Sequence, residues 1–364
     1  MKKLKVGLVG VGGLARGTGY GNVFNNHPRT EVAGICDLDR QALEKARKAF
    51  DLKKSQAFEN YDDFVKADLD IVFLGTPIPV HADQAVKALE NGKHVLSEVT
   101  AANTVKDCER LVKTVKKTGM KYMMAENYYY YHYIQEWQKM IRQGNLGRLF
   151  YAEAEYVHEI RRLLRDPETG KLQWRANRPP IHYCSHCLGP LLMLFDDRII
   201  KATGSGKEAT MMSGVGVGAI DMQIGLFETA KGATIKMLRS QVAPREPPIV
   251  YYGIYGTKGC VENGRTAHPY GHDVTRGIIF IEGEDKVARE VDWPISDPGA
   301  PEEARKGGHG TSEYYLVRDF ISSIENDTEP PINAVRAADI TLPGLIAHDA
   351  AMKGNTWLDV PHFE

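Results

Sequence analysis

The turn from Gly10 to Ala15, with the letters GVGGLA, constrains the fold of this chain more than any other stretch. It follows directly on the apolar run from Val6 to Val9, which predicts a strand ending in a tight glycine turn. In a G-x-G-x-x-A motif the first glycine permits the turn, the second lets backbone N–H groups approach a diphosphate, and the small third residue lets the next helix pack closely. The motif therefore predicts a dinucleotide site, with contacts expected at Gly10, Gly12, Gly13, Leu14 and Ala15.

Predicted strands and helices alternate up to about residue 127. Short apolar runs predict strands buried on both faces, as in a parallel sheet, at 31–36, 71–74, 95–96 and 122–125. Helices with an apolar stripe and a closing glycine are predicted at 82–91 and 104–118. This alternation predicts an α/β, doubly wound Rossmann domain over residues 1–127.

Residues 128–364 have a different pattern, in which strands outnumber helices. A helix is predicted at 134–143, a loop at 296–310, and strands at 149–158, 219–227, 233–238, 249–255 and 278–281. We expect a substrate-binding α/β domain over 128–364, with an open, mainly antiparallel sheet covered on one face and its last residues packing back near the Rossmann domain. A chain of 364 residues is long enough for two cores. The open sheet face favours a homo-oligomer, either a dimer or a tetramer.

Charge and cysteine content exclude several classes of partner. The formal net charge of -1 offers nothing that attracts nucleic acid or an anionic membrane over a long range. No apolar stretch is long enough for a cleavable signal or a membrane span. The five cysteines are an odd number in a long chain, which indicates reduced thiols in the cytoplasm rather than a disulfide framework.

An acidic residue, Asp37, follows the second predicted strand. Its carboxylate can accept both ribose hydroxyls of the adenosine and would repel the 2′-phosphate of NADP, so the sequence favours NAD. Arg40 keeps NADP as a less favoured alternative, because a guanidinium can meet that phosphate or stack on adenine. Thr76 and Pro77 follow the third apolar run at the carboxyl edge of the sheet, where such ligands bind.

Together with pieces further along the chain, these residues resemble the Gfo/Idh/MocA family of sugar-related oxidoreductases. The matching pieces are the turn 10–15, Asp37, the segment 75–77 with His81, the strand end 97–100, the hairpin 256–259 and the segment 342–348. The resemblance spans nearly the whole chain and implies a Rossmann domain plus a C-terminal α/β domain whose sheet face carries the substrate site. His81 is expected either to contact the cofactor or to lie on the surface of the following helix.

One position departs from the family pattern. The family usually has Glu-Lys-Pro where this chain has Glu98-Val99-Thr100, and that lysine commonly helps to position cofactor and substrate and assists proton transfer. Val99 has no polar group for this work. Glu98 remains a candidate contact to the nicotinamide ribose, and Asn127, after the last Rossmann strand, is a further expected cofactor contact.

The segment from Pro179 to Pro190 holds the densest functional signal outside the glycine turn. The family often carries Asp, three residues and then a general acid/base His here, and this chain has His182 and His186 at the two positions. On a helix, residues i and i+4 lie on one face, so both rings are expected to point into one cleft. An imidazole suits removal of the hydroxyl proton when a secondary alcohol is oxidised. We expect His186 and His182 to be catalytic, and the alternative is a buried, hydrogen-bonded histidine.

The same segment contains Cys184-x-x-Cys187. A structural zinc site needs four ligands and no second pair has matching spacing, and the redox motif belongs to a thioredoxin-like unit. Both cysteines are therefore expected to pack in the core. No metal is expected; the less favoured alternative is a catalytic metal held by some of Glu126, His158, His182, His186 and His309.

Several polar and aromatic residues are placed to act on a sugar. Of the four successive tyrosines at 128–131, Tyr128 is predicted at the active site as a catalytic residue. Tyr156 and His158 share one sheet face with Ala154, although plain sheet packing is an equal alternative. The expected substrate contacts are Glu126, Tyr156, His158, Trp174, Arg175 and, on a glycine-rich loop that would close over substrate, His309.

The pieces 123–128, 174–175 and 186–190 also resemble glycoside hydrolase family 109. Those relatives cleave glycosides with NAD by transient oxidation at C3, elimination, addition of water and reduction, with tyrosine and histidine as acid and base, an exception to the two-carboxylate scheme. We expect a net oxidoreductase acting on a ring hydroxyl of a sugar, cyclitol or glycoside. The alternatives are an NAD-recycling glycoside hydrolase or lyase, and a non-catalytic NAD-binding regulatory protein suggested only by the lost lysine.

Overall fold

The computed structural model describes residues 2–12, 16–265 and 273–364, and contacts within the chain divide it into two compact units. The first unit comprises residues 1–127, 299–338 and 363–364, and the second comprises 128–298 and 339–362. Residues 299–338, expected in the second domain, group with the first because helix α8 (Ser312–Glu325) packs against α1 (Gly17–Asn26). Three predicted cofactor contacts, Gly13, Leu14 and Ala15, lie outside the described residues.

The first unit is built on a six-stranded parallel sheet in the order β3-β2-β1-β4-β5-β6. Its strands are β1 (Leu4–Val9), β2 (Thr30–Cys36), β3 (Ala57–Phe58), β4 (Ile71–Leu74), β5 (His94–Ser97) and β6 (Tyr122–Met124). Every residue of β4 is buried, as a strand covered by helices on both faces requires. The strand order reverses between β1 and β4, the kind of position where doubly wound sheets bind ligands. The predicted Rossmann architecture is confirmed.

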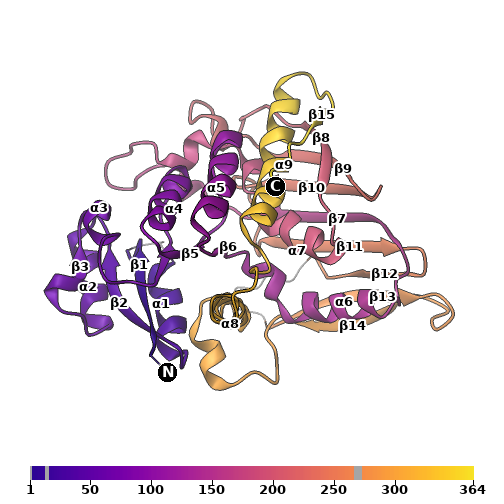
Figure 1. Ribbon diagram of the computed structural model, residues 1–364. Coiled ribbons are helices and arrows are strands. Elements are labelled where there is room, and N and C mark those ends of the chain that lie inside the picture. Colours follow the sequence, from indigo (N-terminus) through magenta and orange to yellow (C-terminus); the bar gives the residue numbers. More distant parts are fainter. Residues whose placement is uncertain (1, 13–15, 266–272) are drawn as a thin grey trace. The chain divides into compact units, whose positions relative to one another are not determined.

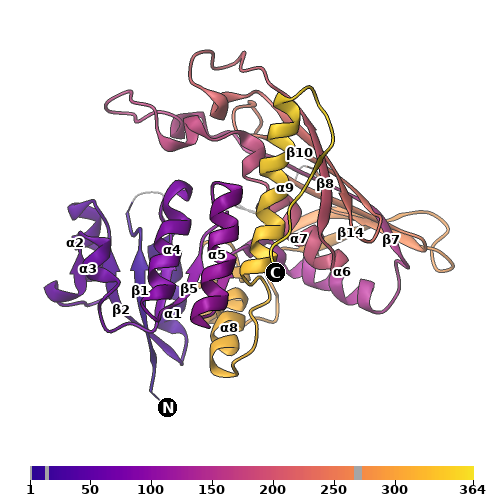
Figure 2. The same ribbon diagram turned by 45° about the horizontal axis from the view of Figure 1, so that its top comes forward.

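Helices flank this sheet where the sequence places an apolar stripe. They are α1, α2 (Arg40–Ala49), α3 (Tyr61–Phe64), α4 (His81–Glu90) and α5 (Val105–Thr118), with α8 returning from late in the chain. The helices α4 and α5 lie side by side (Figures 1 and 2). Helix α5 begins where the Thr104 hydroxyl accepts the Asp107 N–H at 3.1 Å and ends at Gly119, whose φ of 70° suits glycine.

The second unit contains a nine-stranded sheet in the order β14-β13-β12-β11-β7-β10-β9-β8-β15. Its strands are β7 (Leu149–Val157), β8 (Ile199–Ser205), β9 (Gln223–Thr229), β10 (Thr234–Ser240), β11 (Ile249–Gly256), β12 (Gly259–Glu262), β13 (Val274–Ile281), β14 (Arg289–Pro294) and β15 (Leu358–Asp359). Neighbouring strands are antiparallel except β7 and β10, which confirms the predicted mainly antiparallel sheet. Helices α6 (His132–Arg142) and α7 (Ser185–Phe195) lie against one face of this sheet (Figure 2). The last α-helix of the described residues is α9 (Ala334–Met352).

The two faces of this sheet differ in chemistry. Tyr156 of β7 pairs with Arg239 of β10, so their side chains share the face that also carries Ala154 and Met237. The opposite face carries an ion pair between Glu153 and Lys236. That opposite face also exposes apolar side chains on β9, Ile224 at 41% and Leu226 at 39%, where a monomer would leave them in water.

One predicted strand is shifted. The apolar pattern predicted a strand at 219–227, but β9 begins at Gln223 and residues 217–219 form a 3₁₀ turn. A Cβ atom on Gly218 would lie 2.0 Å from the backbone oxygen of Arg175, so only glycine fits where this turn passes the segment Trp174–Asn177.

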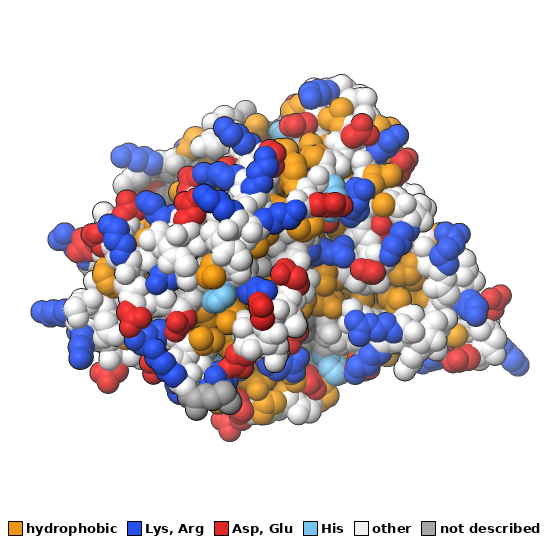
Figure 3. Space-filling view, in the orientation of Figure 1, with side chains coloured by type: hydrophobic (Ala, Val, Ile, Leu, Met, Phe, Trp, Pro, Cys, Tyr) orange, Lys and Arg blue, Asp and Glu red, His pale blue; other side chains and the backbone are white. Residues whose placement is uncertain are grey.

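The surface carries both signs of charge. On the face shown in Figure 3, Lys and Arg side chains are interspersed with Asp and Glu, consistent with a net charge of -1. No helix in the described part of the chain has both the length and the apolar character needed to cross a bilayer. All five cysteines lie in the described part as thiols, and Cys184 and Cys187 are buried, as expected for core packing.

Candidate functional site

The glycine turn after β1 has the geometry its sequence requires. Gly10 has a φ of 79°, and a Cβ atom there would lie 2.7 Å from the backbone oxygen of Gly75. A Cβ atom on Gly12 would lie 2.6 Å from that of Ala42. Only glycine fits at these two positions, and a ligand can approach their backbone without meeting a side chain.

Asp37 is tied to this turn. Its Oδ2 atom accepts the N–H groups of Val11 at 2.8 Å and of Gly12 at 3.0 Å, and its Oδ1 atom accepts the N–H of Asp39 at 2.9 Å. A single carboxylate therefore shapes the glycine turn and stands beside it. The predicted ribose contact requires that carboxylate to keep some acceptor capacity, and each carboxylate oxygen has two lone pairs.

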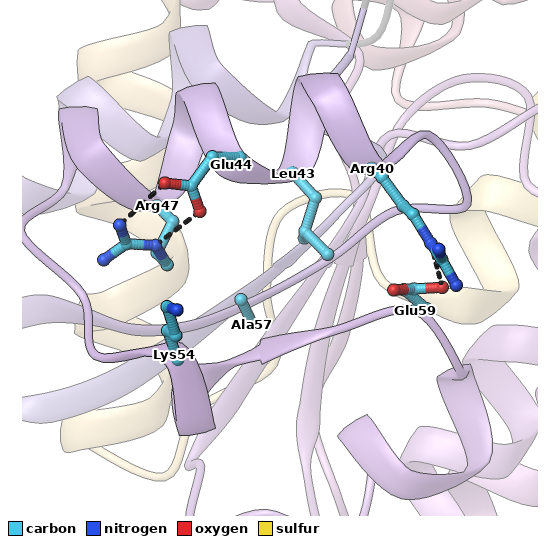
Figure 4. A pocket seen from close by; sticks show the side chains of 7 residues that line it. All are labelled: Arg40, Leu43, Glu44, Arg47, Lys54, Ala57 and Glu59. Atoms are coloured by element: carbon cyan, nitrogen blue, oxygen red, sulfur yellow. Dashed lines mark hydrogen bonds and ion pairs between the residues drawn. The ribbon is translucent and has the colours of Figure 1, made fainter.

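Arg40 lies on the side of α2 that faces β3. Its Nε atom donates to Glu59 at 2.9 Å. Both residues line a surface pocket of about 220 Å³ together with Leu43, Ala57 and three charged side chains (Figure 4). The figure shows Arg40 extended toward Glu59 at one end of this pocket, so the guanidinium already has an acidic partner in the absence of any phosphate.

His81 is buried rather than on the helix surface. It is 1% exposed, and its ring nitrogens lie 3.0 Å from the carbonyl oxygen of Thr100 and 2.6 Å from that of Thr76. The alternative of a surface histidine is therefore wrong. His81 links the two backbone segments that follow β4 and β5. Pro77, on the first of these segments, is the residue before a 3₁₀ turn.

A cluster of charged side chains that the sequence did not predict joins α1 to α8. Arg16 pairs with Glu313, and its Nη2 atom lies 2.8 Å from Nδ1 of His309. His309 Nδ1 also lies 2.9 Å from the Glu313 carboxylate. His309, on the loop predicted to close over substrate, therefore contacts residues of the first unit, to which it belongs. Arg16 is the residue directly before α1.

The carboxyl groups near Arg16 have opposite pKa shifts. Burial raises the pKa of Glu98 to about 7, although the charge of Arg16 acts the other way. Burial also acts to raise the pKa of Glu313, but the His309 hydrogen bond and the charge of Arg16 outweigh it and hold that pKa at about 2. Glu313 is therefore the ionised partner of Arg16, while Glu98 exchanges a proton near neutral pH.

Replacing Glu313 with glutamine is expected to destabilise the fold by about 2–3 kcal/mol at neutral pH, because it leaves Arg16 without its buried counter-charge. The folded pKa of Glu313 lies below the unfolded value, so its contribution is present above about pH 4.3 and is lost as the pH falls toward 2. Denaturant unfolding at several pH values should show the two proteins converging toward pH 2. Glu325→Gln, which breaks a more exposed pair with Arg29, is the matched control and should cost less than about 1 kcal/mol. A difference that stays constant with pH would contradict this assignment.

The second unit brings the predicted His186, Tyr128 and Tyr156 together. The ring of Tyr128 stacks on that of His186, with centroids 3.9 Å apart and an angle of 8° between the planes. Tyr156 meets His186 edge to face at 5.6 Å, and its hydroxyl lies 2.9 Å from Nδ1 of His158. Tyr183, which the sequence analysis did not select, places its hydroxyl 3.2 Å from Nε2 of His186. His186 is 7% exposed and therefore lies within an almost fully buried aromatic cluster.

His182 does not share a helical face with His186. It ends a 3₁₀ turn at Pro180–His182, and α7 begins only at Ser185, so the predicted i, i+4 relation is wrong. The ring of His182 instead meets His348 of α9 edge to face at 5.1 Å. Tyr183, with φ −91° and ψ 56°, breaks the helix between them, and the prolines before His182 restrict the chain in the same way.

Three arginines lie close to this aromatic cluster. The guanidinium carbon of Arg239 lies 4.5 Å from the centroid of Tyr156 and 5.6 Å from that of Tyr183, and Arg178 lies 5.8 Å from Tyr183. The predicted Arg175 stacks on the predicted Trp174 at 4.3 Å. Arg178 and Arg239 were missed, although a charged residue on the apolar side of β10, after Ile235 and Met237, was a usable signal.

His158 and His182, two of the imidazoles beside these arginines, have pKa values lowered far enough to be uncharged at neutral pH. Burial, with the positive charge of Arg239, lowers the pKa of His158 to about 4. Burial, with the charge of Arg178, holds the pKa of His182 well below its ordinary value. His158 is therefore a neutral hydrogen-bond partner of Tyr156.

Glu126 and Asn127, which follow β6, belong to the first unit. Glu126 is fully buried, and Asn127 is 4% exposed. The Nδ2 atom of Asn127 has no hydrogen-bond partner in the part of the chain that the structure describes. Across the same residues, no three His, Cys, Asp or Glu side chains come together as a metal site would require. The unpaired amide donor is a group that a bound polar ligand would satisfy.

The first unit has a parallel sheet that opens into a glycine turn, and the second unit has a mainly antiparallel sheet with a buried cluster of one histidine and several tyrosines. These two units are typical of NAD-binding two-domain oxidoreductases. Residues 4–126 match the model of the oxidoreductase family with an NAD-binding Rossmann fold, Gfo/Idh/MocA. Residues 198–364 match the model of the C-terminal domain of glycosyl hydrolase 109. The chain thus combines an N-terminal segment similar to the Rossmann domain of the Gfo/Idh/MocA oxidoreductases with a C-terminal segment similar to that of glycosyl hydrolase 109.

Individual proteins agree with this assignment. A glycosyl hydrolase family 109 protein of Shewanella woodyi is 28% identical over 370 residues, which cover 90% of this chain and 77% of that protein. An oxidoreductase domain protein from Kribbella flavida superposes with a TM-score of 0.82 at 19% identity, covering 100% of both chains. A levoglucosan dehydrogenase solved with NADH and L-sorbose superposes with a TM-score of 0.82 at 18% identity, also covering 100% of both chains. These structures share the fold of this chain.

Proposed function

We propose that this enzyme is an NAD-dependent oxidoreductase acting on a ring hydroxyl of a sugar, cyclitol or glycoside, with His186 as the general acid/base. The observation that carries the proposal is the hydrogen bond of 3.2 Å between the Tyr183 hydroxyl and Nε2 of His186, inside a buried aromatic cluster. A buried imidazole held at one nitrogen by a phenol can take or give a proton at the other. The NAD-binding fold of the first unit supplies the matching redox function.

The residues of the first unit fit the cofactor. We propose that the backbone at Gly10 and Gly12 receives the diphosphate and that Asp37 receives the adenosine ribose, with Thr76 and Pro77 at the same sheet edge. Glu98 and Asn127 are the proposed contacts nearer the nicotinamide, and the unpaired Asn127 amide supports this. His81 would instead act through the backbone, because both of its ring nitrogens lie against the carbonyl oxygens of Thr76 and Thr100. Bound NAD would supply the hydride acceptor for a secondary alcohol. NADP, with Arg40 as its phosphate partner, is less favoured because Arg40 already pairs with Glu59.

The second unit would hold the carbohydrate and manage its proton. Oxidation of a secondary alcohol releases the hydroxyl proton, which we assign to His186, with Tyr128 stacked against the imidazole to fix its orientation. His182 is assigned a lesser role, since its ring meets His348 instead. The proposed substrate contacts of the second unit are Tyr156, His158, Trp174 and Arg175. The other two predicted contacts, Glu126 and His309, belong to the first unit, where His309 lies against Glu313 and Arg16.

Glycoside cleavage with no net change in NAD is the second candidate function. The match of residues 198–364 to the C-terminal domain of glycosyl hydrolase 109 favours it, as does the name of the Shewanella woodyi relative. Val99 in the family's lysine position does not exclude this candidate. Both candidates use the same histidine and the same fold.

One experiment separates these functions. The protein is incubated with NAD and a panel of sugars, cyclitols and aryl glycosides, and both NADH absorbance and released aglycone are followed. A net oxidoreductase is expected to produce one NADH for each polyol oxidised. Aglycone release without accumulated NADH would assign the glycosidase, and NAD binding with neither product across the panel would contradict both and leave a regulatory protein.

The assembly and location complete the proposal. The apolar side chains of Ile224 and Leu226 on the open sheet face favour a second copy of this chain as partner, giving a dimer or tetramer. Five thiols with no disulfide among them suit a reducing, cytoplasmic environment. Light scattering of the purified protein measures its oligomeric state, and a monomeric mass would contradict the proposed dimer or tetramer.

A further inference from the structure

The phenol of Tyr183 lies among three positive charges from different segments. Arg175 belongs to the 3₁₀ turn at Trp174–Asn177, Arg178 follows that turn, and Arg239 comes from β10. The guanidinium carbons of Arg178 and Arg239 lie 5.8 and 5.6 Å from the centroid of the Tyr183 ring. Within the described residues, the titratable groups that contact Tyr183 from other elements are His186 of α7 and Tyr156 of β7, while the thiol of the next residue, Cys184, acts on Arg178.

Within the described part of the chain, no ion pair joins Arg175 or Arg239 to an acidic side chain. Arg239 is 2% exposed and donates to the carbonyl oxygens of Tyr156, at 3.1 Å, and Ser240. Within the described residues neither Arg175 nor Arg239 pairs with a carboxylate, and Nε of Arg239 has no hydrogen-bond partner. The undescribed residues, 1, 13–15 and 266–272, include no Asp or Glu. A buried guanidinium without a counter-charge is costly, and it cannot escape by losing its proton.

The group best placed to balance this charge is Tyr183 itself. Burial lowers the pKa of each of the three arginines, to about 10 for Arg178, and the charge of Tyr183 acts in the opposite direction on each. Tyr156 interacts electrostatically with Arg239, whereas Tyr183 interacts electrostatically with Arg175, Arg178 and Arg239. An external anion is a poorer answer, because Arg239 lies beneath the tyrosine rings and its Nε atom is buried.

Tyr183 is also in direct contact with the imidazole of His186. Its hydroxyl lies 3.2 Å from Nε2 of His186, while His182, at the position where the family often has Asp, faces His348. We propose that Tyr183 works as a phenolate that holds His186 in the Nε2–H tautomer, with Arg175, Arg178 and Arg239 keeping the phenolate charged. Tyr183 thereby takes the part that a carboxylate has beside the histidine of a Ser-His-Asp triad.

This inference rests on the proposed role of His186 and says how that role is achieved. With Nε2–H donated to the phenolate oxygen, the lone pair of the imidazole is on Nδ1, which accepts the proton of the substrate hydroxyl as its carbon loses hydride. The resulting imidazolium is stabilised by the adjacent negative charge, and the proton later leaves Nδ1 for water. Tyr183 and the arginines act through His186 and are positioning residues.

The test is a spectroscopic titration of the tyrosines in the full-length chain, which needs no substrate. The phenolate absorbance is followed against pH in the wild type, Tyr183→Phe, Arg239→Met and Arg239→Lys. In the wild type, one of the 17 phenols should ionise about three or more pH units below the ordinary value near 10, so that it is charged at neutral pH. Tyr183→Phe should lose this step, Arg239→Met should move it to higher pH, and Arg239→Lys should largely restore it.

Tyr314→Phe is the matched control, because it removes a phenol of α8 and should leave the early step intact. Circular dichroism and NAD affinity verify that each variant is folded. A wild-type titration without an early step, or one that Tyr183→Phe does not alter, would overturn the inference. A second pair of results would also overturn it. If inorganic phosphate or D-glucuronate binds the wild type but not Arg239→Met, and Tyr183→Phe leaves the titration unchanged, then the counter-ion of the arginines is a bound ligand rather than Tyr183.

The outcomes separate this inference from the proposed function. Turnover that depends on His186, together with an ordinary titration of Tyr183, would overturn the inference and leave the proposed function standing. An early phenolate in a protein that turns over no sugar or glycoside would support the ionised Tyr183 and contradict the proposed function.

Discussion

Alanine in place of His186 is expected to reduce turnover by about a hundredfold or more, because general acid–base catalysis contributes roughly that much. NAD affinity should stay unchanged, since His186 belongs to the second unit while the glycine turn belongs to the first. Loss of the ring also removes the face-to-face partner of Tyr128 and the hydrogen-bond partner of Tyr183. Steady-state kinetics on the substrate found by the panel, with calorimetry for NAD, measures both effects.

His132→Ala is the matched control for this variant. His132 is the first residue of α6 and lies outside the aromatic cluster, with Glu136 at 3.9 Å as an acidic neighbour. Its replacement should leave turnover within about twofold of the wild type, because surface substitutions away from a site cost little. Unchanged turnover in His186→Ala would remove this histidine from the mechanism.

Alanine in place of Asp37 is expected to weaken NAD binding by about tenfold to a hundredfold. The carboxylate holds the N–H groups of Val11 and Gly12, and hydrogen bonds to a charged acceptor are worth about 1.5–3 kcal/mol each. Part of that energy keeps the turn in the shape that receives a diphosphate. NADP should be affected less, because the variant no longer repels a 2′-phosphate, so the preference for NAD over NADP should narrow.

The neighbouring Asp39 supplies a control for Asp37. Asp39 caps α2 by accepting the N–H groups of Gln41 at 2.8 Å and Ala42 at 3.2 Å. Asp39→Ala should cost about 1 kcal/mol of stability through the lost cap and leave NAD affinity nearly unchanged. Calorimetric titration of both variants with NAD and NADP gives the comparison, and an Asp37→Ala protein that binds NAD like the wild type would exclude the predicted contact.

The parallel sheet of the first unit was predictable because its signals are local. A short apolar run followed by glycines defines β1 and its turn, and the stripe of α5 ends at Gly119 as predicted. By contrast, nothing near Arg16 in the sequence indicates Glu313, which is 297 positions away and joins it only once α8 packs on α1. Pairs of this kind depend on tertiary packing, to which a single sequence gives no access.

The substrate half was predictable in residue types but not in geometry. His186, Tyr128 and Tyr156 were expected near one another and the structure places them in contact. The helical relation of His182 to His186 failed because the chain turns at Tyr183, and the tyrosine at that turn became the partner of His186. The sequence signal for Arg239 is its position on β10, where it continues the buried apolar face formed by Ile235 and Met237.

Transfer of hydrogen from a ring carbon of the sugar to NAD is the central claim, and it is shared by net oxidation and by transient oxidation during glycoside cleavage. The most direct measurement uses a substrate deuterated at the oxidised carbon, a single turnover quenched in acid or base, and mass spectrometry of the nicotinamide. This account predicts that deuterium appears in the reduced nicotinamide in the wild type and is strongly diminished in His186→Ala. Conversion of the substrate with no deuterium ever reaching the nicotinamide would contradict it.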